Sequence, residues 1–356
     1  MSSIAPESPA AERGGVLVVI PCLNEQAHIE TVLRGLAAEA HRTPMRIVVA
    51  DGGSTDGSRA IVERIAARDS RVILLDNPKR IQSAGVNQAA RLYGAGFAFL
   101  LRVDAHARYP NRFCERLLAI RAKTAADSVV VAMRAVGRTC FERAAAAAQN
   151  SLLGNGGSAH RNHGAGRWVE HGHHALFRLD AFLAVDGYDE SFSHNEDVEL
   201  DLRLRERDFR IYLAGGPSID YFPRGNPLAL YRQYSRIGRG RARNVFKHRR
   251  HAKARHLVLA AVAPILLLAL LAPVSTAFAA PSAAWALLCL GYGATIGLRL
   301  RDRCATAAGV AAMAMQAGWS FGFLAGVAQW LRARAAARRA QPAPAILREA
   351  SDERAA

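Results

Sequence analysis

The sequence predicts an α/β fold with a mainly parallel sheet, followed by a hydrophobic C-terminal region that anchors the chain in a membrane. In the first hundred residues, short apolar segments of strand length alternate with segments of helical apolar spacing. This alternation is typical of a parallel sheet covered by helices on both faces. Residues 257–331 are mostly apolar, and their only charges lie between residues 299 and 303. We therefore expect the first region to fold in water and the second to lie in a lipid bilayer.

The apolar spacing delimits each element of the alternating region. We expect strands at residues 16–20, 46–50, 72–75 and 97–101, and helices at residues 26–40, 58–68 and 82–93. In the first of these helices, Ile29, Val32, Leu33 and Leu36 fall on one face. Ligands of such sheets bind beyond the carboxyl ends of the strands. The loops that follow the strands are therefore the segments that decide function.

The second half of the soluble region is less regular. The alanine run at residues 144–148 favours a helix, and residues 154–166, rich in Gly, Asn and His, predict a long flexible loop. Residues 168–177 read as one strand that carries His171, His173 and His174. Three close histidines raise the alternative of a metal site.

The formal net charge of +17 is unevenly distributed. Between residues 221 and 256 there are many arginines and lysines and no acidic residue. This basic block ends where the first long apolar segment begins, which favours contact with the phosphates of a membrane surface. No nucleic-acid-binding motif accompanies the charge, so we expect no nucleic-acid partner.

The cysteines and the N-terminus indicate a reducing compartment. The five cysteines form no CxxC pair, which predicts neither a zinc site nor a disulfide framework. Isolated thiols fit the cytosol. Residues 1–13 are polar, are expected to be disordered, and lack the apolar core of a signal peptide. We therefore expect the first domain, residues 14–230, to lie on the cytoplasmic side of a bacterial-type inner membrane.

Three predicted strands are followed by polar loops. They read Pro-Cys-Leu-Asn-Glu at 21–25, Asp-Gly-Gly-Ser-Thr-Asp-Gly at 51–57 and Asp-Ala-His at 104–106. Ser54 or Asp56 alone would be explained as a cap of the next helix. Three polar loops on one sheet edge instead indicate a binding site.

Four motifs in order identify a family. They are Val-Val-Ile-Pro-Cys-Leu-Asn-Glu from residue 18, Ala-Asp-Gly-Gly-Ser-Thr-Asp-Gly from 50, Leu-Arg-Val-Asp-Ala-His from 101 and His-Asn-Glu-Asp-Val-Glu-Leu from 194. Together they resemble the family 2 glycosyltransferases, which implies the GT-A nucleotide-sugar-binding fold, a Rossmann-like mixed sheet. Residues 233–243 and the apolar tail are similar to the succinoglycan-biosynthesis ExoA branch. The resemblance covers about residues 14–330.

The resemblance implies a role for each matching residue on the donor side. Pro21, Asn24 and Glu25 would lie along the nucleoside, and Asp51 would accept a hydrogen bond from the uracil ring. Asp104 matches the first aspartate of the metal-binding Asp-x-Asp motif, which holds a divalent cation, Mg²⁺ or Mn²⁺, on the phosphates. The third position of that motif is His106 rather than aspartate. An imidazole suits Mn²⁺ better than Mg²⁺, or it can bind a phosphate.

The resemblance also places the acceptor side. Asp197 would be the catalytic base that takes the proton of the acceptor hydroxyl, with Glu196 and Asp189 on the acceptor side. A plainer reading of Glu196 and Asp197 is an acidic helix N-terminus that complements the dipole. Gln233 and Arg236 have the spacing of the Gln-x-x-Arg-Trp motif, in which they would contact the donor pyrophosphate. Ile237 replaces the tryptophan, which argues against processive synthesis.

We divide the rest of the chain into three parts. Residues 231–256 form a basic juxtamembrane segment, residues 257–331 a transmembrane region of two to three segments, and residues 332–356 a tail that is largely disordered. The uncharged stretches are 257–280, 281–298 and 305–331. A third full span would place Arg332 and Arg334 outside, against the positive-inside rule. Gly318, Gly322 and Gly326 form a stripe that suits close helix packing.

The resulting prediction is an inverting glycosyltransferase. It would move a hexose, glucose by resemblance, from a UDP-sugar to a lipid-linked oligosaccharide in exopolysaccharide or cell-surface glycan synthesis. The alternative is a non-catalytic UDP-sugar-binding membrane scaffold on the same fold, which the His106 departure would favour. A nucleotidyltransferase or an oxidoreductase on a similar sheet is a third reading, and the missing GxGxxG fingerprint argues against the oxidoreductase.

Overall fold

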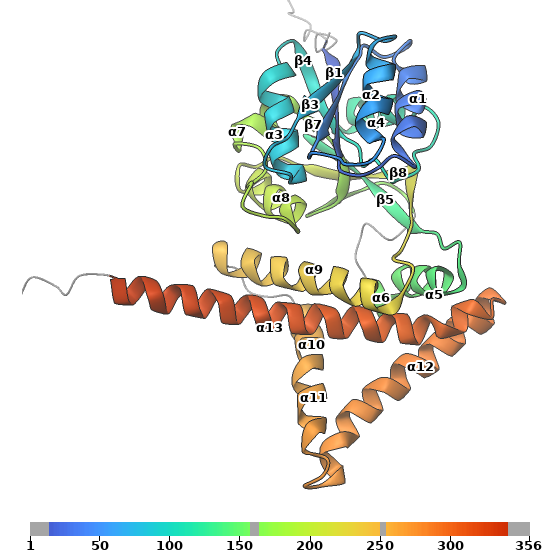
Figure 1. The fold of residues 1–356 in the computed structure, drawn as a ribbon, viewed down its shortest axis with the longest axis vertical. Helices are drawn as coiled ribbons and strands as arrows, with labels where there is room; N and C mark the ends of the chain where they lie inside the picture. The colour runs from blue at the N-terminus through green and yellow to red at the C-terminus, as the bar shows by residue number, and fades with distance from the viewer. Residues whose placement is uncertain (1–13, 157–163, 250–253, 341–356) are drawn as a thin grey trace, which may run out of the picture.

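The computed structural model describes residues 14–156, 164–249 and 254–340 (Figure 1). The expectations for residues 1–13, for most of the loop at 154–166 and for the end of the tail lie outside these residues. A sheet-and-helix domain stands on a pair of long helices, and a helical hairpin projects from the far side of that pair. The α/β fold with a C-terminal hydrophobic region is confirmed.

The sheet has eight strands in the order β3-β2-β1-β4-β7-β5-β8-β6. The four strands expected near the N-terminus are all present, at β1 Gly15–Cys22, β2 Met45–Asp51, β3 Val72–Asp76 and β4 Phe97–Arg102. They pair in parallel, so their carboxyl ends share one edge. Next to them, β7 runs antiparallel to both β4 and β5, which makes the sheet mixed.

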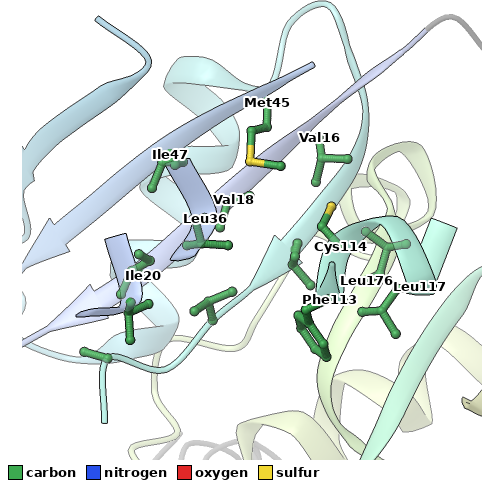
Figure 2. Close-up of a cluster of buried hydrophobic side chains, with 14 of the residues drawn as sticks. Val16, Val18, Ile20, Leu36, Met45, Ile47, Phe113, Cys114, Leu117 and Leu176 are labelled. Atoms are coloured by element: carbon green, nitrogen blue, oxygen red, sulfur yellow. The ribbon is translucent and has the colours of Figure 1, made fainter. Parts of the chain in front are cut away.

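Helices cover both faces of the sheet. They are α1 Ile29–Glu39, α2 Ser58–Ala66, α3 Gln82–Tyr93, α4 Phe113–Thr124, α7 Leu179–Ala184 and α8 Glu196–Glu206. Side chains of β1 alternate between two cores because successive residues of a strand point to opposite faces. Figure 2 shows the core on the α1 and α4 side, where Val16, Val18 and Ile20 meet Leu36 and Phe113. The other core joins Leu17 and Val19 to α3, α7 and α8.

The segment expected as one strand at 168–177 is in fact two strands, which corrects that prediction. The strands of this half are β5 Ser128–Ala135, β6 Arg167–Val169, β7 His173–Arg178 and β8 Ile211–Tyr221. β6 pairs with β8 at the sheet edge, whereas β7 inserts between β4 and β5. The chain crosses between them at Gly172, where a Cβ would lie 2.2 Å from the side chain of Val130. Only glycine fits this crossing.

Two long helices form a platform below the sheet-and-helix domain (Figure 1). They are α9 Pro227–Lys247 and α13 Ala308–Ala340, and they lie side by side (Figure 1). Asn226 caps α9 by accepting a hydrogen bond from the Ala229 amide at 2.8 Å, and Pro227 occupies its first turn. The helix therefore begins before the expected boundary at residue 231. Residues 231–247 of the expected juxtamembrane segment are therefore helical.

The glycine stripe of α13 is the contact surface with α9. A Cβ on Gly318 would lie 2.4 Å from the Tyr231 carbonyl oxygen, and one on Gly322 would lie 2.0 Å from that of Ser235. The backbones therefore approach more closely than any larger residue permits. The expectation of close helix packing at this stripe is confirmed, and its partner is α9. The domain also rests on α13 through α5 Cys140–Gln149, whose alanines pack against it, and the short α6 Leu152–Asn155.

The hairpin consists of broken helices. Its elements are α10 Ala254–Ala260, α11 Val262–Leu268, η2 Ala269–Leu271, η3 Thr276–Ala279, α12 Ala280–Leu300 and η4 Cys304–Ala307. Pro264 has no N–H for the Ala260 carbonyl, and the Ser320 hydroxyl of α13 donates to that oxygen at 2.9 Å instead. Ser320 also accepts from the Ala263 amide at 2.9 Å. A single buried hydroxyl thus joins the first hairpin arm to the platform.

Within the part of the chain that the structure describes, three helical stretches are long and apolar enough to cross a membrane: Ala254–Leu271, Thr276–Leu300 and Cys304–Ala336. The third differs from the others in its packing. In the most apolar part of the third stretch, 50% is buried inside the protein, compared with 17% and 22% in the first and second stretches. It also lies along α9 and across the open end of the hairpin (Figure 1).

A disulfide joins Cys140 at the start of α5 to Cys304 in η4, which corrects the expectation that the cysteines are isolated thiols. Local spacing such as CxxC could not indicate this pair, because the two cysteines are 164 residues apart in sequence. Beside the disulfide, Arg143 donates to Asp302 at 2.9 Å. The domain and the turn between α12 and α13 are therefore linked by a covalent bond and an ion pair.

Candidate active site

The loops after β1 and β2 are bonded to each other through side chains. The Asn24 amide donates to the Ser54 hydroxyl at 2.9 Å, and the Asn24 side-chain oxygen accepts from the Thr55 amide at 2.8 Å. Asn24 adopts a left-handed conformation, with φ of 57°, which asparagine tolerates better than most residues. Pro21 occupies the end of β1, directly before this loop. The two loops therefore form one unit at the sheet edge.

Asp51 is buried at the carboxyl end of β2. Its carboxylate accepts from the Gly53 amide at 3.1 Å, the Ser54 hydroxyl at 2.5 Å and Arg59 at 2.9 Å. Burial opposes the ionisation of this carboxyl, but the hydrogen bonds from Ser54 and Arg59 outweigh it and lower its pKa. Asp51 is therefore an ionised acceptor. The sequence reading did not include its partner Arg59.

Glu25 and His106 connect the first loop to the loop after β4. The Glu25 carboxylate lies 2.9 Å from Nδ1 of His106, whose side chain is 47% exposed. This hydrogen bond raises the pKa of His106 against the opposing effect of burial. The contact fixes the ring of His106 at the rim of the site, with Nε2 on the side away from Glu25.

Asp104 follows β4 and lies between two basic side chains. Its carboxylate oxygens are 3.5 Å from Nε of Arg102 and 3.7 Å from Nε2 of His174. Burial would raise its pKa, but the electrostatic influence of the neighbouring His174 ring and Arg102 guanidinium lowers it. Within the described residues, no three His, Cys, Asp or Glu side chains are grouped to hold a metal ion. Asp104 therefore fits a cation that shares its coordination with phosphate oxygens, rather than a cation held by a protein cage.

The acidic pair Glu196 and Asp197 opens helix α8, after Asn195 in a left-handed conformation with φ of 63°. Asp197 Oδ1 accepts from Arg102 Nη1 at 2.6 Å and from the Tyr188 hydroxyl at 3.0 Å. Glu196 lies 3.2 Å from the same Arg102 nitrogen. Both carboxylates thus face the end of β4.

The two acids of the pair have opposite protonation tendencies. Burial and the neighbouring charge of Asp197 raise the pKa of Glu196. Burial acts against ionisation of Asp197 as well, but Arg102 and His173 overcome it and hold its pKa far below the ordinary value. One carboxylate is therefore ionised while its neighbour tends to be neutral, as expected for two buried acids that share one cation.

The three histidines near β7 do not form a metal site. His171 lies 2.7 Å from Asp201, His173 lies 3.0 Å from Asp197, and His174 lies 3.0 Å from the Tyr109 hydroxyl. His171 and His173 thus contact carboxylates of α8, whereas His174 contacts Tyr109. The metal alternative for these residues is therefore not supported.

Asp189 lies at the turn before α8 and faces α9. It pairs with Lys247 at 2.7 Å and accepts from Ser191. Burial would raise the pKa of Asp189, but the hydrogen bonds from Lys247 and Ser191 outweigh this effect and lower the pKa to about 2. Its neighbour Tyr188, and not Asp189 itself, is bonded to Asp197. Asp189 therefore connects the turn to the platform.

Gln233 and Arg236 lie on α9, below the site. The Gln233 side-chain amide donates to the Tyr221 hydroxyl at 2.6 Å. Arg236 is exposed, and after burial its charge is the second cause that lowers the pKa of His194, two residues before Glu196. A Cβ on Gly240 would lie 2.6 Å from the His194 carbonyl oxygen. Helix α9 therefore packs directly against the loop that leads to the acidic pair.

Comparison with known proteins assigns the family. Residues 17–185 match the glycosyl transferase family 2 model, and residues 103–298 match the model of glycosyl transferase family group 2. The chain is 52% identical over 307 residues to the succinoglycan biosynthesis protein ExoA of Rhizobium meliloti (strain 1021), covering 86% of this chain and 93% of that protein. The chain belongs to the family 2 glycosyltransferases. Within that family it falls in the ExoA branch.

A solved structure supports the GT-A fold of this glycosyltransferase. The mannosyltransferase PcManGT from Pyrobaculum calidifontis, solved in complex with GDP-Man and Mn²⁺, superposes with a TM-score of 0.58. The match covers 88% of this chain and 87% of that one, at 19% sequence identity. The family assignment makes the chain an enzyme, so the non-catalytic scaffold is not supported.

Arg102 lies at the centre of the candidate site and was not predicted from the sequence as a site residue. It is buried and contacts Asp104, Glu196 and Asp197, and its Nη2 donates to Gln82 at 2.6 Å. A charge at the end of the apolar strand Phe-Ala-Phe-Leu-Leu was the available signal. A charge in such a place needs a partner. Here it joins the donor-side acid to the acidic pair.

Proposed function

We propose that this glycosyltransferase moves a hexose, with inversion at the anomeric carbon, from a UDP-sugar to a lipid-linked oligosaccharide in the synthesis of an exopolysaccharide or another cell-surface glycan. The observation that carries the proposal is the cluster around Arg102. There Asp104, the donor-side acid, meets Glu196 and Asp197. Transfer requires this proximity, because the acceptor oxygen attacks the carbon that leaves the diphosphate.

The donor assignment rests on the joined loops after β1 and β2. Among the described residues, Asp51 Oδ1 contacts only Ser54, so an ionised oxygen retains capacity to accept from the ring N–H of uracil. Pro21, Asn24 and Glu25 lie on the adjacent loop, where the nucleoside would extend. Glucose is the proposed sugar because of the kinship with the ExoA branch.

The residues present fit a divalent cation, Mg²⁺ or Mn²⁺, at Asp104, and PcManGT was solved with Mn²⁺. The Asp104 side chain is 23% exposed, which leaves it accessible at the sheet edge. When bound, the cation neutralises negative charge on the departing diphosphate. His106, oriented by Glu25, would complete the site or bind a phosphate oxygen. Arg236 and Gln233 would face the pyrophosphate from α9, where a planar guanidinium suits phosphate.

Asp197 is the proposed catalytic base. The acceptor hydroxyl gives its proton to Asp197 as its oxygen forms the new bond to the anomeric carbon, and the bond from that carbon to the phosphate oxygen breaks. Because the attack comes from the side opposite the leaving group, the configuration inverts. Glu196 would line the acceptor side beside it, and Asp189 would hold the turn that carries Tyr188.

The arrangement of the helices supports a membrane-bound acceptor. In our proposal the α10–α12 hairpin crosses an inner membrane, the α9–α13 platform lies at its cytoplasmic surface, and the catalytic domain faces the cytoplasm. The third apolar stretch is then interfacial. Arg332 and Arg334 consequently stay on the cytoplasmic side, in agreement with the positive-inside rule. The site would open beside the surface where a lipid-linked glycan is presented.

The test measures transfer of radiolabelled hexose from UDP-glucose into the lipid extract of membranes that contain the protein. A screen of other UDP-sugars, read by UDP release, identifies the donor. Asp197→Asn should lower transfer by about 10²–10⁴-fold, the usual contribution of a general base. Glu63→Gln, an exposed acid of α2, is the matched control and should leave it unchanged.

Two results would contradict the proposal. Undiminished transfer by Asp197→Asn would remove the base assignment. Binding of UDP without turnover of any UDP-sugar by the wild-type protein would remove the proposed reaction.

A further inference from the structure

Two carboxylate–histidine pairs lie side by side between α8 and the start of β7. Asp197 and Asp201 are one helical turn apart on α8. His173 begins β7, and His171 lies two residues before it, in the crossing from β6. The inner pair joins Asp197 Oδ2 to His173 Nδ1 at 3.0 Å, and the outer pair joins Asp201 to His171 Nδ1 at 2.7 Å. The two histidines therefore face the two aspartates, and the pairs form two rungs of a ladder.

The outer rung combines the buried Asp201 with the partly buried His171, whose side chain is 20% exposed. Asp201 is 2% exposed, and burial raises its pKa well above the ordinary value. Burial likewise lowers the pKa of His171. Both shifts favour the uncharged forms, so the rung adds no net charge beside the active site. Asp201 also accepts from the Gly172 amide at 3.1 Å, which fixes the crossing between β6 and β7.

The outer rung sets the orientation of the inner one. The rings of His171 and His173 meet edge to face, with centroids 4.7 Å apart and planes at 82°. Because His171 is itself held by Asp201, it fixes the plane of the His173 ring. Nδ1 of His173 is thereby directed at Asp197.

We propose that His173 is the positioning residue of the catalytic base: it holds Oδ2 of Asp197 in place for the acceptor hydroxyl, with the His171–Asp201 pair as its support. This inference rests on the proposed role of Asp197. Oδ1 of Asp197 is already bonded to Arg102 and Tyr188. Oδ2 lies outside the guanidinium contact and is therefore the oxygen at which a proton is accepted with less opposition.

Without His173, one oxygen of Asp197 stays attached to Arg102 and the other is free to turn. A displacement of about 1 Å in a catalytic group lowers a rate by roughly 100-fold. Donor binding is unaffected, because Asp51 and Asp104 lie on other strands. The loss is therefore expected in kcat rather than in the KM for the donor.

The pH profile supplies a second readout. The charged and titratable groups that act on Asp197 are Arg102, Asp104, His171, His173, His174, Tyr188, Glu196 and Asp201. Among them, the His173 hydrogen bond lowers the pKa of Asp197, after the larger effect of Arg102. Its loss raises that pKa, so the acid limb of kcat moves to higher pH. A purely structural residue would not move the limb.

The experiment compares four forms of the full chain in membranes: wild type, His173→Ala, His173→Asn and the control His41→Ala, an exposed histidine after α1. We expect His173→Ala to lower kcat about 100-fold, with an unchanged donor KM and a shifted acid limb. His173→Asn places an amide nitrogen where Nδ1 of the histidine lies. This variant should recover most of the wild-type kcat and the wild-type position of the acid limb in the pH profile of kcat. His41→Ala should match the wild type.

A wild-type kcat and pH profile in His173→Ala would overturn the proposal. So would a His173→Asn variant that is folded, binds UDP and remains as slow as His173→Ala. If His173→Ala does not fold, the asparagine variant alone decides, since it must keep both kcat and the acid limb. Failure of the wild type to transfer any sugar would instead count against the proposed function.

Discussion

The loops after β1 and β2, which we propose bind the donor, and the acidic pair Glu196 and Asp197 lie at the same edge of the sheet, but they are held in different ways. Around Asn24, Ser54 and Asp51, short polar side chains bond to backbone amides of the same two loops. Around Asp197, buried charges from distant parts of the chain meet at Arg102. The first arrangement tolerates the loss of one bond because water can replace it. The second does not, because a buried charge without its partner is costly.

The largest expected effect follows from breaking the buried cluster. Arg102→Met leaves three carboxylates without their shared cation, and should lower the free energy of unfolding by about 3–5 kcal/mol and abolish transfer. Chemical denaturation and the transfer assay measure both. Arg116→Met, an exposed arginine of α4, is the control and should change stability by less than about 0.5 kcal/mol. A stable and active Arg102→Met protein would refute the contrast between the loops around Asp51 and the buried cluster around Arg102.

A pH-dependent loss of stability should also be specific to the buried side. Burial lowers the pKa of His174 to about 4, so the folded protein keeps it neutral. Stability from this group is complete above its ordinary pKa of about 6.5 and is lost as the pH falls toward 4, by about 3 kcal/mol. His174→Asn keeps a residue that tolerates the φ of 53° at this position.

In denaturation between pH 7 and pH 4, that variant should lose less stability than the wild type. Part of the acid sensitivity will persist in this variant, because burial also lowers the pKa of His171. Identical slopes for the two proteins would show that His174 is not held neutral.

The smallest effect is expected on the donor side. Ser54→Ala removes one hydrogen bond to Asp51 and one from the Asn24 amide. A bond of this kind contributes about 1 kcal/mol, which corresponds to a roughly fivefold rise in the KM for the donor. Unfolding and kcat should change little. A collapse of kcat in this variant would show that the donor loops are as tightly coupled as the acidic cluster.

The same contrast explains what the sequence could reveal. Asn24, Asp51 and Asp56 lie in short motifs directly after strands, so strand periodicity places them at one edge. Arg102 and Asp197 are 95 residues apart, and their contact depends on how β4, β7 and α8 come together. His173 was visible only as one of three histidines, because the break after β6 that assigns each ring its partner is a tertiary feature.

The α9–α13 platform shows a similar limit on what can be predicted from the sequence. Hydropathy identified the third apolar stretch, and the spacing of Gly318, Gly322 and Gly326 predicted close packing. Neither property shows which helix the stripe packs against. The partner is visible only in the tertiary structure, where Gly318 and Gly322 meet backbone atoms of Tyr231 and Ser235 on α9.

The bond between Cys140 and Cys304 closes the chain into a covalent ring. The ring contains the acidic pair, helix α9 and the whole hairpin, while β1 to β4 lie outside it. A protease that cuts once between residues 140 and 304 therefore releases no fragment. The nicked protein keeps its full mass on a non-reducing gel and separates into two bands only after a reductant is added, whatever the position of the cut within the ring.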